Sequence, residues 1–201
     1  MLYDKQQIAS KLLHWEEFLH EFRLPVWDEL PQIELYMDQV IVLLNEYLSY
    51  FVYEGNDEKL ITAAMVNNYV KMKLVPAPVR KKYGRVHLAY LIMICTLKQS
   101  LRLSMLPTLL PGNLPEEDVK TAYAAFALRH RHCAKYFLEQ VRLTAAAMFD
   151  REVPTELNVR DTPEMIVSAA ILSGFTNLFA EKLVLLDGKT LADGGSIEVQ
   201  K

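Results

Sequence analysis

Two groups of residues in this chain have the types and the spacing needed to bind DNA. Asn67, Asn68 and Lys71 lie at helical spacing, and the run RKKY (residues 80–83) follows shortly afterwards. Asparagine can bond the N6/N7 edge of adenine with both of its amide groups, and lysine can reach a phosphate or a guanine. The pattern predicts a helix that enters the major groove and a loop that holds phosphates.

The charge distribution points to the same segment. The formal net charge is −3 at pH 7, yet no Asp or Glu occurs between Glu58 and Glu116. Nine basic residues fall in this stretch, which leaves thirteen basic and 25 acidic residues elsewhere. They are Lys59, Lys71, Lys73, Arg80, Lys81, Lys82, Arg85, Lys98 and Arg102. Such segregation is expected of an anion-binding segment, most often one that binds nucleic acid. The alternative is that the stretch packs against an acidic segment of the same chain, and charge alone does not decide between them.

Helices must position these residues, because apolar residues recur every three or four positions along the whole chain. We expect helices over about 4–22, 35–53, 62–73, 86–100, 116–149 and 162–183, with a short one from Ser104 to Pro107 or Pro111. The fold class predicted is all-α, with a winged helix-turn-helix whose loop could pair as a minimal β wing. The glycine-containing tail after Asp187 is expected to fray or to form a small hairpin.

The helix over 62–73 is the predicted recognition helix. Thr62 is its expected N-cap, and the prolines at 76 and 78 cannot continue it. One side should be packed and the other open, with small residues that permit close approach to DNA. The packed side comprises Met65, Val66, Tyr69, Val70 and Met72, and the open side comprises Ala63, Ala64, Asn67, Asn68 and Lys71. The alternative interpretations are an ordinary amphipathic helix with a polar solvent face and an ordinary solvated basic loop.

Composition divides the chain into three regions and excludes several classes. The stretch LPGNLPEED marks a boundary, so we expect an N-terminal helix (1–30), the winged helix-turn-helix (31–112) and a helical dimerisation or sensing region (113–201). The N-terminus lacks a signal-peptide pattern, and the longest apolar run (about 86–97) is too short to span a bilayer. Cys95 and Cys133 are expected to be buried thiols in a reducing cytoplasm, so a cytoplasmic protein without membrane contact is predicted.

No constellation of residues predicts catalysis. Phosphate-binding glycine loops, nucleophile elbows and zinc-protease motifs do not occur, so we expect no enzyme and no cofactor. RHRHC (residues 129–133) places His130 and Cys133 on one helix face, but no second pair has suitable spacing, so no metal site is predicted.

The central segment resembles the winged helix-turn-helix of the MerR family. Its residues that take the places of that pattern, in order, are Thr62, Tyr69, Leu74, Val75, Pro76, Tyr83, Leu88 and the stretch LRLSML. It departs from the pattern at Asn67 and Asn68, where that family usually has Arg and Tyr, and in a longer turn before Thr62. Residues after Pro115 do not resemble a metal-binding or single long coiled-coil MerR tail, so the resemblance leaves the type of small-molecule effector unknown.

A closer resemblance is to a bacterial family of unknown function numbered 1836. The stretches of this chain that resemble members of that family are LPQIELYMDQV, MVNNYVK, KKYGRVHLAYL and LKQSL. The resemblance covers about residues 30–110.

These observations and resemblances predict a transcriptional regulator that binds double-stranded DNA as a homodimer. The alternative is a protein-interaction module on a winged-helix scaffold that binds an acidic protein partner. The expected DNA contacts are Thr62, Ala64, Asn67, Asn68, Lys71 and Lys73 from the helix over 62–73, and Arg80, Lys81, Lys82, Tyr83 and Arg85 from the basic wing over 79–85.

Overall fold

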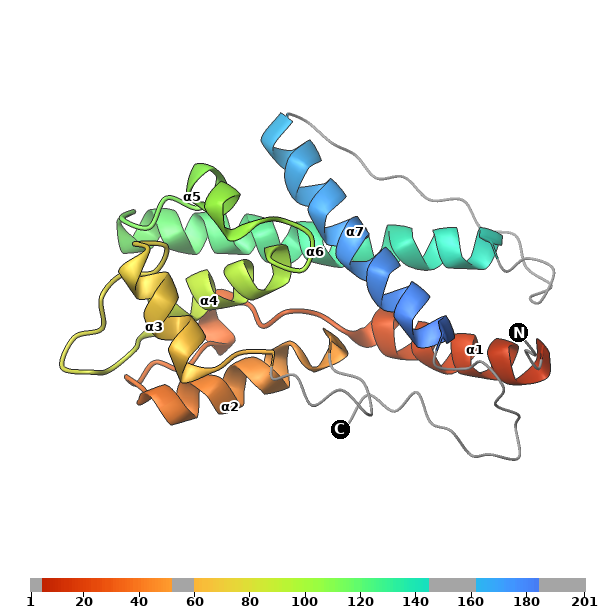
Figure 1. Cartoon of the computed structure of the whole chain (residues 1–201), viewed down its shortest axis with the longest axis horizontal. Helices are drawn as coiled ribbons and strands as arrows, with labels where there is room; N and C mark the ends of the chain where they lie inside the picture. Colours follow the sequence, from red (N-terminus) through yellow and green to blue (C-terminus); the bar gives the residue numbers. More distant parts are fainter. Residues whose placement is uncertain (1–4, 52–59, 145–161, 185–201) are drawn as a thin grey trace. The chain divides into compact units, whose positions relative to one another are not determined.

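The computed structural model of the chain describes residues 5–51, 60–144 and 162–184, and it divides into two compact units (Figure 1). The central unit comprises Leu24–Val52 and Asn56–Arg129. The terminal unit comprises Met1–Arg23, Tyr53–Gly55 and His130–Lys201. Each unit is described separately below.

All of the regular elements in the described residues are helical, which confirms the predicted all-α class. The α-helices are α1 (Lys5–Glu21), α2 (Met37–Tyr47), α3 (Ala63–Lys71), α4 (Arg85–Leu97), α5 (Leu106–Leu109), α6 (Glu116–Thr144) and α7 (Thr162–Val184). Short 3-10 helices cover Trp27–Glu29, Ser49–Phe51 and Leu103–Met105. Extended pairing in the described ranges is limited to two isolated β-bridges, Leu35 with Tyr83 and Val79 with Lys82.

The helix predicted over 35–53 is shorter than expected at both ends. Its N-terminus is moved to Met37 because Leu35 forms an antiparallel bridge with Tyr83, which requires extended backbone at Leu35. Tyr36 takes the N-cap position, and its backbone N–H donates to Gln39 Oε1 at 2.9 Å. Helix α2 ends at Tyr47 and a 3-10 turn follows. The predicted start of the first helix at residue 4, the end of the sixth helix near 149 and the tail after Asp187 lie outside the described residues.

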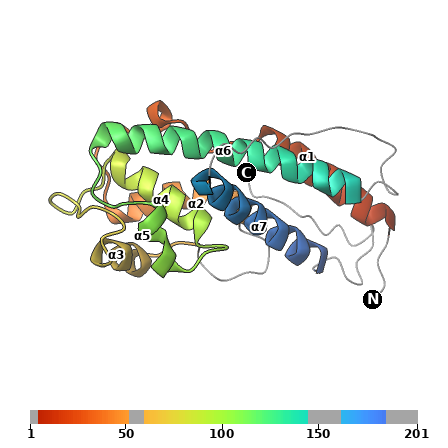
Figure 2. The same ribbon diagram turned by 90° about the horizontal axis from the view of Figure 1, so that it is seen from above.

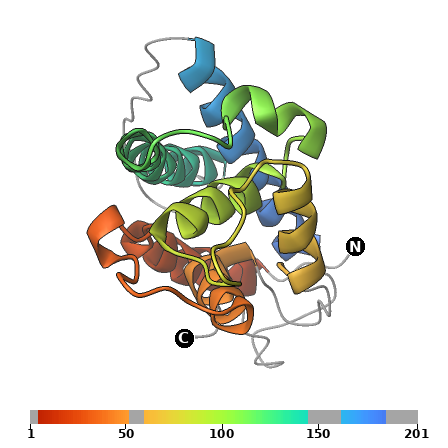
Figure 3. The same cartoon turned by 90° about the vertical axis from the view of Figure 1, so that its left-hand side faces the viewer.

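Helix α4 is the centre of the central unit. Ten of its thirteen residues, from Leu88 to Leu97, are buried, and it packs against α2. Figure 3 shows α4 in the middle of this group, with α2, α3 and α5 around it. A helix that is apolar on all sides can be stable in water only when other elements cover it, so α4 fixes where its neighbours lie.

The first half of α6 belongs to the central unit, which therefore extends past the boundary predicted at 112. Val119 and Tyr123 are buried, and the Tyr123 hydroxyl donates to the Pro25 carbonyl at 2.7 Å. The Trp27 ring packs edge-on against Tyr123 with centroids 6.4 Å apart. The segment before the 3-10 turn at Trp27–Glu29 and the start of α6 are thus joined, although the proline-rich composition of 111–115 marks a boundary between them.

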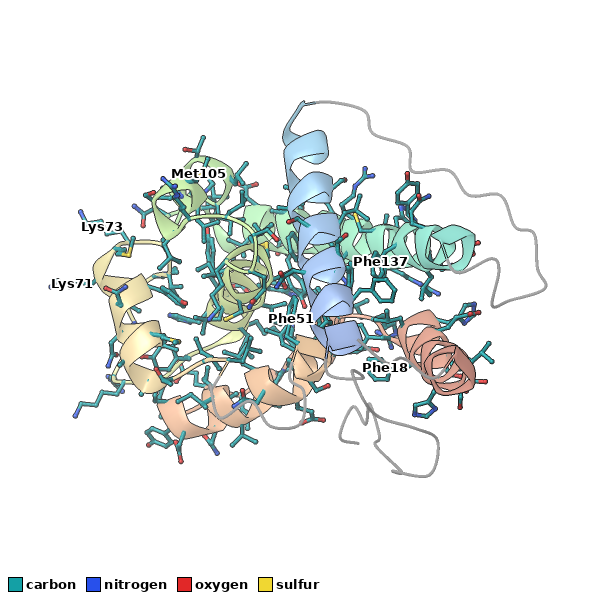
Figure 4. All side chains as sticks on the ribbon, turned by 45° about the vertical axis from the view of Figure 1, so that its right-hand side comes forward. Phe18, Phe51, Lys71, Lys73, Met105 and Phe137 are labelled. Atoms are coloured by element: carbon teal, nitrogen blue, oxygen red, sulfur yellow. The ribbon has the colours of Figure 1, made fainter. Side chains whose placement is uncertain are left out.

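The terminal unit contains α1, the second half of α6 and α7, and its core is aromatic. His130 is completely buried, with the Phe22 ring 6.0 Å and the Phe175 ring 5.3 Å from its own. Phe137, labelled in Figure 4, stacks on Phe175 at 5.5 Å. Burial disfavours the charged imidazolium and lowers the pKa of His130 to about 3. The buried Cys133 thiol donates to the Ser168 carbonyl at 3.8 Å.

Acidification is expected to destabilise the chain through His130. The pKa of an unfolded histidine is about 6.5, so below that pH the unfolded chain binds a proton that the folded chain does not. The contribution of uncharged His130 to the free energy of unfolding should be fully present above pH 6.5 and should be lost as the pH decreases from 6.5 toward 3. The free energy of unfolding should fall by about 2 kcal/mol between pH 7.5 and pH 5. Urea titrations at several pH values measure this loss. His130→Gln should remove this dependence of stability on pH. His132→Gln, at an exposed position of the same helix, should keep it. The same pH dependence in His130→Gln as in the unaltered chain would contradict the prediction.

Candidate nucleic-acid interface

Helix α3 presents the predicted open face to solvent. The hydroxyl of Thr62 accepts a hydrogen bond from the Met65 backbone N–H at 3.3 Å, which confirms the N-cap. Val66 and Tyr69 are buried and hold the helix on the unit. All five residues predicted for the open side are exposed, namely Ala63, Ala64, Asn67, Asn68 and Lys71.

The placement of the two methionines on the packed side of this helix was wrong. Met65 is 37% exposed and Met72 is 39% exposed. They lie at the margin of the open face because the packed stripe is narrow and is filled by Val66 and Tyr69. The sulfur of Met72 accepts a hydrogen bond from the Asn68 side-chain amide at 3.5 Å. Met72 therefore belongs to the surface that the two asparagines form.

The end of α3 places Lys73 in an unfavourable backbone conformation. The Lys73 N–H donates to Val70 O and the Leu74 N–H donates to Tyr69 O, both at 3.0 Å, which is the Schellman pattern. This pattern needs left-handed backbone at the residue after the C-cap, where glycine is usual, and Lys73 has φ 60°. A side chain there costs roughly 1 kcal/mol.

Gly112 packs directly against this strained turn. A Cβ atom on Gly112 would lie 2.0 Å from the Lys73 carbonyl oxygen, far inside van der Waals contact. The Tyr90 hydroxyl of α4 donates to the Pro111 carbonyl at 2.5 Å and so holds the Pro111–Gly112 backbone in place. Glycine is thus required at position 112 because the backbone there lies against the backbone of Lys73, and this contact supports the turn at Lys73.

The basic loop (residues 79–85) turns sharply at its tip. Val79 and Lys82 form an antiparallel bridge, with the Lys82 N–H donating to Val79 O at 2.9 Å. Arg80 and Lys81 between them have φ 50° and 63°, which is the signature of a type I′ turn. Asn-Gly is the preferred pair in that turn, because both central residues need positive φ. The loop projects from the central unit beside α3 (Figures 1 and 2).

Every non-glycine residue with positive φ in the described ranges is basic. These residues are Lys73, Arg80 and Lys81, and all three side chains are exposed. Lysine and arginine have no side-chain group that favours this conformation, unlike Asn or Asp. Backbone strain of this kind concentrates at functional sites, because it persists only where the surrounding structure holds it.

The base of the basic loop is fixed to the segment that precedes α2. Tyr83 and Leu35 exchange both backbone hydrogen bonds at 2.9 Å, and the Tyr83 side chain is only 3% exposed. Like the bridge between Val79 and Lys82, this pairing is isolated and continues into no strand in the described residues. The buried Tyr83 side chain thus supports the base of the loop.

His87, which the sequence left open between a phosphate contact and a structural role, contacts Ala77 just before the basic loop and Gly84 near its end. Its Nδ1 accepts from the Gly84 backbone N–H at 3.0 Å, and its Nε2 lies 3.5 Å from the Ala77 carbonyl oxygen. Burial is the main cause that lowers the pKa of His87, so the ring is neutral and Nε2–H is the donor. The signal available in the sequence is a histidine three residues after a glycine at a helix start.

Three other basic residues of the segment make contacts within the protein. Arg85 is half-buried and its Nε donates to the Leu30 carbonyl at 3.2 Å, while Lys98 donates to the Leu60 carbonyl at 2.6 Å. Lys82 lies 4.0 Å from a Glu34 oxygen and 5.6 Å from the centre of the Tyr36 ring. An exposed pair of this kind contributes less than about 1 kcal/mol.

The described residues do not place an acidic segment against the basic stretch. Within them, Lys82 alone of its basic residues has a carboxylate within 4.0 Å. Lys71, Lys73, Arg80 and Lys81 face solvent without such a partner in the same ranges.

The described residues contain neither a candidate metal cluster nor a candidate membrane span. The described part of the chain has no group of three or more His, Cys, Asp and Glu side chains that could hold a metal ion. In the same part, none of the helices combines the length and the apolar character needed to cross a bilayer.

The architecture defines an all-helical protein whose central unit carries a capped helix, a basic loop and a buried helix in succession. The chain belongs to the family described as Domain of unknown function (DUF1836), whose model matches residues 25–126. This confirms the predicted membership of that family, and the matched range coincides closely with the central unit. No curated protein and no solved structure matches the chain.

Replacing Gly112 with alanine is expected to destabilise the central unit by about 2 to 3 kcal/mol, because the added Cβ would meet the backbone of Lys73. Gly84→Ala is the matched control, since a Cβ at Gly84 has nothing within 4 Å. Gly84 is the N-cap of α4, where alanine is less favourable than glycine, so its replacement should cost about 0.5 to 1 kcal/mol, well below the cost of Gly112→Ala. Thermal and urea unfolding of the two variants measure the difference, and equal stabilities would refute the close approach at Gly112.

Proposed function

We propose that the protein is a DNA-binding transcriptional regulator with a winged helix-turn-helix arrangement similar to that of the MerR family. Helix α3 enters the major groove, and the basic loop contacts phosphates. The observation that carries the proposal is the set of three exposed basic residues in left-handed backbone, Lys73, Arg80 and Lys81. Glycine or asparagine would be more stable at these positions, and at Arg80 and Lys81 no carboxylate of the described residues compensates the strain, so these two charges in particular indicate a ligand.

The arrangement of the central unit supports this proposal. Lys71 and Lys73 project from the end of α3 (Figure 4), and the basic loop lies at the same end of the unit (Figure 1). The N-terminal half of α3 offers Ala64 and Asn67, which are short enough to let the helix approach base edges. Lys81 and Arg80 are at the tip of the loop, where a narrow turn can reach the sugar–phosphate backbone.

The predicted contact residues take two kinds of role in this proposal. Thr62, Tyr83 and Arg85 hold the structure through the cap, the bridge to Leu35 and the bond to Leu30. The DNA contacts are made by Ala64, Asn67, Asn68, Lys71, Lys73, Arg80, Lys81 and, beside its contact with Glu34, Lys82.

The protein acts in the cytoplasm as a homodimer without catalytic activity. Two copies double the contact with DNA and fix the spacing of two half-sites, which is the usual arrangement for readers of short sites. The stoichiometry of the protein–DNA complex in the assay below tests this point: one chain per bound site would contradict the dimer.

Binding to DNA should be strongest at low salt and should depend on the loop charges. A gel-shift titration with genomic fragments at about 50 mM salt is expected to show complexes, because counterion release favours binding there. Changing Arg80, Lys81 and Lys82 to Ala together should reduce the slope of log K against log salt by up to about three. Binding of an acidic protein, with no DNA complex at any salt concentration, would instead support the interaction module.

A second variant separates the charge of the loop from its shape. Arg80→Asn with Lys81→Gly installs the preferred type I′ pair, so stability should rise by about 1 kcal/mol while DNA affinity falls. Arg80→Lys keeps the charge and should keep the salt slope. Thermal unfolding and the gel shift measure the two effects, and a variant that is more stable with unchanged affinity would show that the charges do not contact DNA.

A further inference from the structure

We infer that Glu34 restrains DNA binding by holding Lys82, so that Lys82 contributes least among the cations at the tip of the basic loop. The inference rests on the proposed function and deepens it, because it assigns unequal shares of phosphate binding to Arg80, Lys81 and Lys82. Glu34 is a positioning residue in this account, since it acts on DNA binding through Lys82.

The pairing of Leu35 with Tyr83 determines which side chains surround Lys82. Side chains alternate between the two faces of extended backbone, so the neighbours of a buried bridge pair point to the opposite face. Leu35 and Tyr83 are buried, whereas Glu34 and Tyr36 are exposed. Tyr36 lies directly across the antiparallel bridge from Lys82, and Glu34 is the diagonal neighbour of Lys82. These three side chains therefore share the outer face of the bridge.

Lys82 is already engaged within the protein, unlike the two residues at the tip of the turn. Its Nζ lies 4.0 Å from Glu34 Oε2 and 5.6 Å from the centre of the Tyr36 ring. Arg80 and Lys81 are exposed, and no carboxylate of the described residues lies within 4.0 Å of either. The loop thus offers two cations without a carboxylate partner in those ranges and one cation with such a partner.

Counterion release turns this difference into unequal contributions to affinity. A lysine or arginine that leaves water for a phosphate releases a cation that was condensed on the DNA, and this release favours binding at low salt. When Lys82 moves from Glu34 to a phosphate, the DNA releases a cation but the Glu34 carboxylate is left to attract one, so the net release is close to zero. Arg80 and Lys81 have no such offset. Lys82 therefore adds little affinity while Glu34 is charged.

Glu34→Gln tests the inference, because it removes the charge and keeps the size of an exposed side chain. Fluorescence anisotropy with a labelled duplex of mixed sequence measures the affinity of the full chain between about 50 and 200 mM salt. The variant should bind about fivefold more tightly at about 50 mM salt, since it no longer competes with phosphate for Lys82. The slope of log K against log salt should steepen by about one, so the gain should fall below about twofold at 200 mM.

Glu46→Gln is the matched control for the change in net charge. Glu46 is an exposed carboxylate near the end of α2, about 14 Å along the helix axis from Met37 at its start. Its affinity and salt slope should equal those of the unaltered chain. The same gain in Glu46→Gln as in Glu34→Gln would show that net charge alone is responsible and would overturn the inference.

The Lys82→Ala background separates an effect through Lys82 from direct repulsion between Glu34 and phosphate. Glu34→Gln should raise the affinity about fivefold in the unaltered chain and should produce no gain in the Lys82→Ala background, which is the coupling that a double-mutant cycle measures. An equal gain in both backgrounds would show that the carboxylate repels phosphate by itself, and it would overturn the inference. A loss of salt slope in Lys82→Ala as large as that in Arg80→Ala would also overturn it.

The outcomes distinguish this inference from the proposed function. Binding that depends on Arg80 and Lys81 but does not respond to Glu34→Gln overturns the role of Glu34 and leaves the phosphate contacts standing. Failure of the unaltered chain to bind the duplex at about 50 mM salt overturns the proposed function itself.

Discussion

The pairing of Tyr83 with Leu35 is the contact on which the surface of the central unit depends. Two backbone hydrogen bonds of 2.9 Å join the end of the basic loop to the residue just before α2. The loop between α3 and α4 would otherwise be attached only at its ends, and ordering it would cost conformational entropy without a compensating contact. With Tyr83 buried and His87 bonded to both ends of the loop, the tip at Arg80 and Lys81 is held at a defined distance from α3.

Sequence periodicity predicted the helices of this chain well and predicted the fine geometry of the surface poorly. The Thr62 cap and the burial of Val66 and Tyr69 follow from local rules, because capping and helical spacing involve residues close in sequence. The late start of α2 depends on the pairing of Leu35 with Tyr83, and the role of Gly112 depends on its close approach to Lys73, so both depend on segments that are distant in sequence. The exposure of Met65 and Met72 depends on how narrow the packed stripe of α3 is. A composition rule likewise marked a boundary at 111–115, while the Tyr123–Pro25 hydrogen bond carries the central unit across it.

Under the proposed function, the surface of α3 and the basic loop separates affinity for DNA from selectivity among bases. The part of α3 that faces outward in its first two turns is uncharged, so it adds little to non-specific attraction. The charges are gathered at the end of the helix and in the loop, where they can neutralise phosphates without choosing among bases. An acidic chain can present a cationic surface here because one stretch of its sequence contains no carboxylate. Glu34 lies outside that stretch, but the fold brings it within 4.0 Å of Lys82.

The three strained basic residues are not equally informative about function. Lys73 lies at the C-terminal end of α3, where the helix dipole places partial negative charge, and a cation there gains about 0.3 to 1 kcal/mol. That gain offsets most of the roughly 1 kcal/mol cost of left-handed backbone, so its charge is partly explained by the fold alone. Arg80 and Lys81 form the tip of a turn with no helix end beside them, and no carboxylate among the described residues lies within 4.0 Å of either. Their strain has no such compensation, so the case for a phosphate ligand rests chiefly on these two residues.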